Sequence, residues 1–325
     1  MIDLKLLKTI DPKIILIGSH PGIIQSMLDF DYLAGREKPT VVGIIATGRK
    51  FERYFFGKKE VLIPFYSDFG TVSSNKKDSV NLFLNVSSAR RVLSNCKAVF
   101  ETFPNVLGGA VFAEEVPEKH SIELFELAKE KKKFIVGPAS VGLLIPKILK
   151  LGAIGGTDYR QILQSDLLTL GSVAVFSASG GMTNEVIRIV ANSGSLLSFS
   201  LHFGGDRFPI TQPLDAFELA QKDPSTKTIV YYGELGGFDE YKVVELLKTK
   251  KLTKKVICYI AGTISDLFET PPQFGHAKAM AASQDQGARA KRDALKKAGA
   301  QVAESFEEFV EMIGSIGQKK EDATI

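Results

Sequence analysis

The sequence of 325 residues contains no tryptophan and only two cysteines, Cys96 and Cys258. Both cysteines lie inside apolar or helix-like segments, so we expect buried free thiols of a reducing compartment and no disulfide framework. No apolar run reaches the roughly 18 residues of a membrane-spanning helix. The first residues also lack the uninterrupted apolar stretch of a secretory signal. We therefore expect a cytoplasmic protein with no membrane partner.

Other common signatures are missing as well. The net charge of +4 is small and spread along the chain, and basic residues do not alternate with aromatic ones. We therefore expect no nucleic-acid partner. The chain has no Gly-x-Gly-x-x-Gly loop and no Gly-x-x-x-x-Gly-Lys-Ser/Thr loop, which argues against an NAD site and against an ATP-binding P-loop. We also predict no metal ligands.

What the chain does contain is a regular alternation of short β-branched runs with amphipathic segments, which is typical of parallel sheets flanked by helices. The expected strands span residues 13–19, 40–46, 61–65, 81–86, 106–112, 133–136, 172–176, 196–202, 228–232 and 255–260. Around residues 143–165 the pattern loosens, and we interpret this stretch as a domain join. The sequence thus predicts two α/β domains, residues 1–150 and residues 151–325.

One strand–turn–helix element, residues 175–185, contains Ser179, Gly180 and Gly181 at the point where the helix should begin. Glycines let the backbone approach an anion closely, and the free amides of a helix N-terminus carry partial positive charge. Two interpretations are open from the residues alone. The turn binds a phosphate or carboxylate, or Ser179 merely caps the helix.

A single histidine, His276, stands between Gly275 and Ala277 in a loop-like stretch. Imidazole can act as a covalent nucleophile and carry a phosphoryl group, although a loop histidine is more often a surface or capping residue. Glu234 ends an expected strand, where open α/β sheets place their active sites. Its carboxylate could hold the second imidazole N–H and fix the tautomer, or it could be a solvated loop residue.

Several of these motifs occur in an order that resembles the α subunit of succinyl-CoA synthetase and, more closely, the corresponding region of ATP-citrate lyase. The matching segments are residues 27–32, 57–64, 137–142, 177–185, 204–209, 233–237 and 273–277. The resemblance covers nearly the whole chain. We expect neither the ATP-grasp region nor the citrate-synthase-like region of that family within these 325 residues. The chain is therefore most similar to the small-subunit branch of citryl-CoA synthetase.

The resemblance implies a Rossmann-like CoA-binding domain followed by a flavodoxin-like ligase domain that carries a phosphohistidine loop. It implies that ATP and Mg²⁺ bind an ATP-grasp large subunit in a hetero-oligomer, which phosphorylates His276. Citrate would take the phosphoryl group, and coenzyme A would displace phosphate to give citryl-CoA. Glu234 would orient His276, and the turn at 179–181 would hold phosphate or the substrate carboxylate. The implied CoA contacts are Ser19, Pro21, Gly22, Thr47, Ser88 and Arg90.

Three alternatives stay open. Lys278 replaces a glycine that is usual in the family, and its side chain either neutralises phosphate or points away. The acid could be succinate or another acid, which would make the chain the α subunit of a different ADP-forming acyl-CoA synthetase. A non-catalytic CoA-binding regulator is more distant, because such a module has no use for an oriented nucleophile. We expect His202, at the end of a strand, to be structural.

Overall fold

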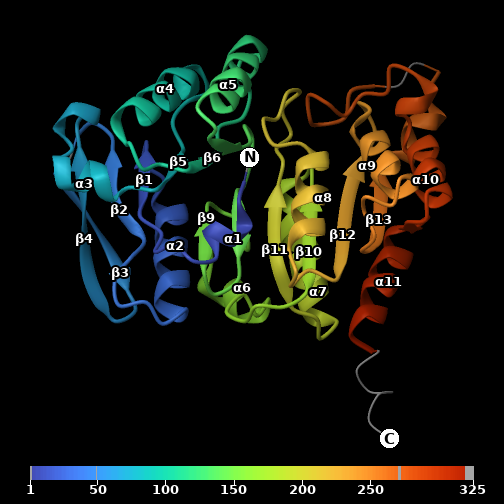
Figure 1. The fold of residues 1–325 in the computed structure, drawn as a ribbon, viewed down its shortest axis with the longest axis horizontal. Coiled ribbons are helices and arrows are strands. Elements are labelled where there is room, and N and C mark those ends of the chain that lie inside the picture. The colour runs from blue at the N-terminus through green and yellow to red at the C-terminus, as the bar shows by residue number, and fades with distance from the viewer. Residues whose placement is uncertain (1, 49, 270–271, 319–325) are drawn as a thin grey trace, which may run out of the picture.

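Two seven-stranded sheets with helices packed on their faces make up the computed structural model, which describes residues 2–48, 50–269 and 272–318 (Figure 1). The predicted α/β class is confirmed. Strands between residues 14 and 136 form the sheet on the left of Figure 1, and strands between residues 143 and 302 form the sheet on the right. Among the described residues, no helix combines the length and the apolarity that crossing a bilayer requires.

The first sheet has the order β3-β4-β2-β1-β5-β6-β7. All neighbouring pairs are parallel except β3 with β4, which form an antiparallel hairpin at the edge. The strands are β1 (Ile14–Ile17), β2 (Val41–Ile45), β3 (Phe51–Phe56), β4 (Lys59–Tyr66), β5 (Leu82–Asn85), β6 (Gly108–Val111) and β7 (Phe134–Val136). The helices are α1 (Leu4–Leu7), α2 (Pro21–Leu33), α3 (Ser74–Ser79), α4 (Val92–Thr102) and α5 (Glu118–Glu130). Without β3, the order is that of a Rossmann fold, whose strand order reverses between β1 and β5 while the strands stay parallel.

The second sheet has the order β14-β13-β12-β10-β11-β8-β9. Its strands are β8 (Leu143–Ile145), β9 (Leu149–Leu151), β10 (Val173–Ser177), β11 (Leu197–His202), β12 (Thr228–Glu234), β13 (Lys255–Ala261) and β14 (Gln301–Val302). Its helices are α6 (Tyr159–Gln164), α7 (Gly180–Asn192), α8 (Pro213–Lys222), α9 (Asp239–Lys248), α10 (Ala288–Lys297) and α11 (Phe306–Gln318). The parallel strands β10 to β14 follow the flavodoxin order, which reverses between β10 and β12.

The stretch 143–165, interpreted from the sequence as a loose join, is regular structure. It contains β8, β9 and α6, and β8 pairs antiparallel with β11. Strands of three residues are too short to show a period, which is why the pattern misled us. The division predicted between residues 150 and 151 falls inside β9, although a separation of the chain into two domains there stays a prediction.

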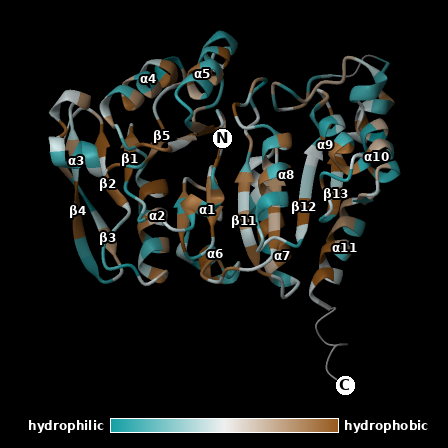
Figure 2. Cartoon of the chain, in the orientation of Figure 1, coloured by the Kyte–Doolittle hydropathy of each residue, from teal (hydrophilic) through white to brown (hydrophobic). Residues whose placement is uncertain are grey.

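Apolar strands form the interior of both halves. Figure 2 shows hydrophobic residues concentrated on the strands and hydrophilic ones on outer helices such as α10. One buried cluster runs through both halves and includes Leu16 of the first sheet and Phe176 of the second. Because the two sheets share a core, residues at their facing strand ends can build one site.

Candidate active site

The strongest candidate site lies at the carboxyl ends of β10 and β12, where the strand order of the second sheet reverses. Such a reversal opens a crevice between loops that leave the sheet toward opposite faces. The turn from β10 into α7 carries Ser179, and the last residue of β12 is Glu234. The two elements that the sequence singled out separately therefore lie side by side.

His276 meets Glu234 at this crevice. The imidazole Nδ1 lies 2.8 Å from Oε2 of Glu234, in the geometry of an N–H donating to a carboxylate. The side chain of His276 is 36% exposed and that of Glu234 16% exposed. The hydrogen bond to Glu234 raises the pKa of His276, whereas burial opposes it; the negative charges of Glu234, Glu114 and Asp206 raise it further. When Nδ1 carries the proton and donates it to Glu234, the lone pair of the neutral ring is on Nε2. This nitrogen makes no hydrogen bond within the described part of the chain.

The turn at Ser179 has the form of an anion site. Ser179 caps α7 with extended backbone angles, and its Oγ accepts the N–H of Met182 at 3.5 Å. The hydroxyl of Ser177 accepts the N–H of Ser179 at 2.9 Å and fixes the turn. A methyl group at Gly181 would meet no atom within 4 Å, so this backbone faces open space. The free amides at the start of this 13-residue helix belong to the same turn, and such amides favour negative charge.

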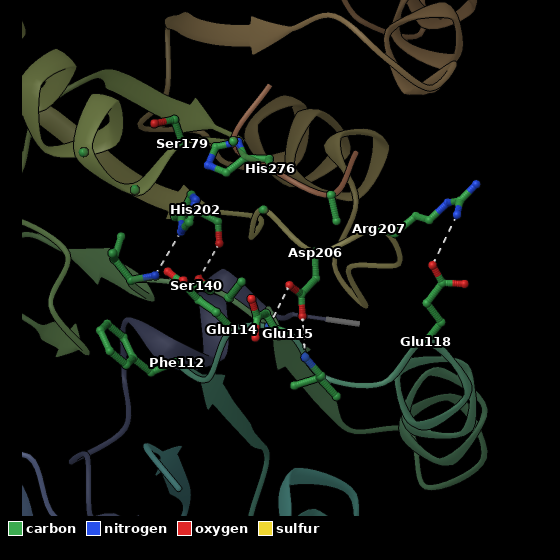
Figure 3. A pocket seen from close by; sticks show the side chains of 18 of the residues that line it. Phe112, Glu114, Glu115, Glu118, Ser140, Ser179, His202, Asp206, Arg207 and His276 are labelled. Atoms are coloured by element: carbon green, nitrogen blue, oxygen red, sulfur yellow. Dashed lines mark hydrogen bonds and ion pairs between the residues drawn. The ribbon is translucent and has the colours of Figure 1, made fainter. Parts of the chain in front are cut away.

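A pocket of about 620 Å³ joins these elements. The second half lines it with Ser179, Gly180, Gly181 and His276, and the first half with Phe112 and residues 114–118. Figure 3 shows His276 and Ser179 on one side of the pocket, with Glu114 and Glu115 across from them. The pocket is therefore closed by both halves of the chain and has room for a small organic acid.

Two further residues support the site: His202, which we expected to be structural, and Gly205. His202 is buried; its Nδ1 accepts the N–H of Val141 at 2.9 Å, and its Nε2 lies 3.0 Å from the carbonyl oxygen of Ala178. Burial lowers the pKa of His202 to about 4, so the ring is neutral and ties the β10–α7 turn to the neighbouring loop. Gly205 packs against the His276 ring, where a larger residue would collide. In the sequence, Gly205 belongs to the segment 204–209, which resembles ATP-citrate lyase but by itself indicates no contact with His276.

Asp206 connects the two halves at the pocket wall. Its two carboxylate oxygens accept the backbone N–H groups of Glu115 and Val116, each at 3.1 Å (Figure 3). Glu115 has a φ of 59°, in the left-handed region that non-glycine residues rarely adopt. The carboxylate thus stabilises an unusual turn that carries Glu114 and Glu115 into the pocket.

Lys278 points away from the pocket. Its ammonium pairs with Asp239 at the start of α9, and the end of its side chain lies beside Gly237. Of the two interpretations left open by the sequence, neutralising phosphate or pointing away, the structure therefore agrees with pointing away.

The residues implied as CoA contacts lie elsewhere, at the carboxyl ends of β1, β2 and β5. Exposed positions follow each of these strands: Ser19, Pro21, Gly22, Thr47, Ser88 and Arg90. None of these residues lines the pocket at His276. A link exists through His20, whose ring contacts Phe112 edge-on at 5.7 Å, and Phe112 lines the pocket. The six residues thus gather at the β1/β5 reversal of the first sheet, and their role as CoA contacts stays a prediction.

In the described ranges, no group of three or more His, Cys, Asp or Glu side chains could hold a metal ion.

Comparison with known proteins identifies the second half of the molecule. Residues 176–312, which include Ser179, Glu234 and His276, match the family model described as CoA-ligase. This part of the chain is therefore similar to CoA-ligase domains. It is the flavodoxin-like half together with its histidine loop.

Relatives of the whole chain extend the match beyond the CoA-ligase domain. The chain is 35% identical over 308 residues to the probable ATP-citrate synthase subunit 1 of Schizosaccharomyces pombe, covering 94% of this chain and 50% of the relative. It superposes on ATP citrate lyase of Methanosaeta concilii, solved in complex with (3S)-citryl-CoA, with a TM-score of 0.89, 32% identity and coverage of 95% and 50%. The same values hold for ATP citrate lyase of Methanothrix soehngenii, solved in complex with citrate and coenzyme A. The chain therefore spans about half the length of these relatives.

Proposed function

We propose that this chain is the small subunit of an ATP-dependent citrate–CoA ligase, which forms citryl-CoA and releases ADP and phosphate. The observation that carries the proposal is the 2.8 Å contact of His276 with Glu234 at a pocket that α7 enters by its N-terminus. Relatives named ATP-citrate synthase, and lyase structures with citryl-CoA or with citrate and coenzyme A, support citrate as the acid.

The first step is phosphoryl transfer to His276. The lone pair of Nε2 attacks the γ-phosphorus of ATP, and the bond from that phosphorus to the leaving oxygen of ADP breaks. Glu234 holds the proton on Nδ1 and stabilises the positive charge that the ring acquires, as an orienting carboxylate does in other nucleophilic sites. ATP with its Mg²⁺ is supplied by an ATP-grasp large subunit, which makes the enzyme a hetero-oligomer.

Two displacements follow. A citrate carboxylate oxygen attacks the phosphorus and the N–P bond breaks, so that His276 is regenerated and citryl phosphate forms. The amides of Gly180 and Gly181 and the hydroxyl of Ser179 are placed to stabilise the phosphoryl oxygens. The CoA sulfur then attacks the citryl carbonyl carbon, the C–O bond to phosphate breaks, and phosphate takes up the thiol proton.

Coenzyme A is assigned to the first half of the chain. Ser19 lies just before α2, Pro21 and Gly22 form its first positions, and the guanidinium of Arg90 suits the phosphates. The His20–Phe112 contact leads from this turn toward His276, which gives the thiol a route to the acyl group. The buried free thiols of Cys96 and Cys258, whose pKa values burial raises to about 12, support a cytoplasmic location.

The decisive experiment labels the histidine. The chain, combined with its nucleotide-binding partner and ATP labelled at the γ-phosphate, should acquire a label that is stable in base and lost in acid. The His276→Ala variant should acquire none, and a label that persists in this variant contradicts the proposal.

A second experiment identifies the acid. The complex receives ATP, CoA and either citrate or succinate, and products are followed by mass spectrometry. Citryl-CoA should accumulate without cleavage to oxaloacetate until a separate lyase is added. Much faster formation of succinyl-CoA would instead make the chain a succinyl-CoA synthetase α subunit.

A further inference from the structure

A fully buried lysine stands behind the Glu234–His276 pair. The side chain of Lys291, on α10, is 0% exposed, and its ammonium lies 2.6 Å from Oε2 of Glu240, which is 6% exposed. The other oxygen of Glu240 accepts the hydroxyl of Tyr231 at 2.8 Å. Burial raises the pKa of Tyr231 well above its ordinary value, so this hydroxyl remains a donor. A buried ion pair contributes little net stability compared with apolar residues of the same volume, so its position invites another explanation.

The remaining two N–H groups of the ammonium supply that explanation. One donates to the backbone carbonyl of Glu234 at 3.0 Å, and the other donates to the carbonyl of Gly236. An ammonium has three donors, and Lys291 therefore uses all of them. Two of the three fix the segment 234–236, which leaves β12 and carries the carboxylate that meets His276.

The segment 234–236 also contacts the loop that carries His276. Gly236 has a φ of 91°, and a methyl group there would lie 2.0 Å from the carbonyl oxygen of Lys278. Its N–H donates to the carbonyl of Gln286 at 2.8 Å. The backbone at Gly236 is thus in close contact with the loop that presents His276, so a shift of this segment would move both partners of the Glu234–His276 contact.

We propose that Lys291 is a positioning residue for His276, which acts by clamping segment 234–236 so that the Glu234 carboxylate meets Nδ1. This inference deepens the proposed function, on which its catalytic meaning rests. Lys291 does not touch the imidazole or the pocket lining, so its influence passes through the backbone of Glu234 and Gly236.

The pKa of His276 reports the clamp. The charged or titratable groups that act on this imidazole are Glu234, Glu114, Asp206 and His202. Removing a nearby positive charge would by itself favour imidazolium and raise the pKa. Loosening the Glu234 hydrogen bond would lower it toward the ordinary value of about 6.5. The sign of the shift therefore separates positioning from a direct charge effect.

The test is Lys291→Met in the full chain, with ¹⁵N-labelled histidines titrated by NMR; the chain has only four histidines to assign. We expect the pKa of His276 to fall and the rate of its phosphorylation to drop by about 10- to 100-fold, the usual effect of misplacing a reacting group. The matched control is Arg292→Met. Arg292 is the neighbouring buried cation, 4% exposed, and it donates to the carbonyls of Ile260 and Glu304 instead. This control should lower the melting temperature and leave the pKa of His276 unchanged.

An unchanged or raised pKa in folded Lys291→Met, or an equal fall in Arg292→Met, overturns the proposal. If Lys291→Met does not fold, Tyr231→Phe replaces it, because it keeps the ring in the core and removes only the donor to Glu240. Tyr231→Phe should lower the pKa of His276 by less than Lys291→Met. If Tyr231→Phe leaves this pKa unchanged, the proposed clamp is wrong. The two proposals can also fail separately. If the wild-type chain is never phosphorylated, but the pKa of His276 still falls in Lys291→Met, the proposed function is contradicted and the positioning role of Lys291 is retained.

Discussion

Gly205 and His276 are in contact at the pocket, and a methyl group on Gly205 would lie 2.7 Å from Cδ2 of the imidazole. The ring and its hydrogen bond to Glu234 can occupy this position only because residue 205 has no side chain. Residue 205 thus limits where the imidazole can lie.

Substituting Gly205→Ala should therefore displace the imidazole by about 1 Å, because 2.7 Å is far below an ordinary carbon–carbon contact, and disturb the Glu234 contact. Misplacement of a reacting group on this scale lowers rates by about 10- to 100-fold. We expect slower phosphorylation of His276 in the complex, measured with labelled ATP. The folded state should survive, because the ring is partly exposed and able to move. A rate equal to that of the wild type would contradict the contact.

At Gly181 we expect substitution to affect substrate binding and not the position of His276. An added methyl group meets nothing within 4 Å, so Gly181→Ala should leave the melting temperature nearly unchanged. The methyl would occupy the space in front of the helix amides and hinder an anionic substrate, so the KM for citrate should rise. Gly314→Ala in α11 is the control, since residue 314 is equally open and lies on another helix. Equal KM values for both variants would show that no anion binds at the turn.

The pH dependence of phosphorylation should report the Glu234 contact. Only unprotonated Nε2 can attack phosphorus, so the rate should fall as pH drops through the raised pKa of His276. Glu234→Gln removes the negative charge, which should move this limb to lower pH and reduce the plateau. The contribution of His276 to the free energy of unfolding has the opposite pH dependence from the phosphorylation rate. The raised pKa contributes stability that is complete below about pH 6.5 and is lost as pH rises through the folded value. Identical rate profiles for the wild type and Glu234→Gln would contradict the assignment.

His202 should govern acid sensitivity. Its pKa is about 4 in the folded protein and about 6.5 when unfolded, so the unfolded state binds the extra proton between these values. The free energy of unfolding should therefore fall by up to about 3 kcal/mol as pH drops from 6.5 to 4, and this term should then level off. Urea denaturation at several pH values measures the slope, and His202→Gln should lack it. A slope that persists unchanged in this variant would assign the acid sensitivity to other groups.

The sequence alone determined the α/β class and most strands, because apolar runs of four to seven residues between helical segments have few other solutions. It also singled out Ser179, Glu234 and His276 as candidates, because a glycine turn before a helix, a carboxylate after a strand and a histidine beside a glycine can be read from local residues. The tertiary structure alone decided how these residues meet, because 42 residues separate Glu234 from His276 along the chain. It also decided the direction of Lys278, the backbone groups that His202 contacts, and the contacts of Gly205 and Lys291. No local pattern shows which backbone a distant glycine touches or which carbonyls a buried ammonium reaches, because both depend on packing between elements far apart in sequence.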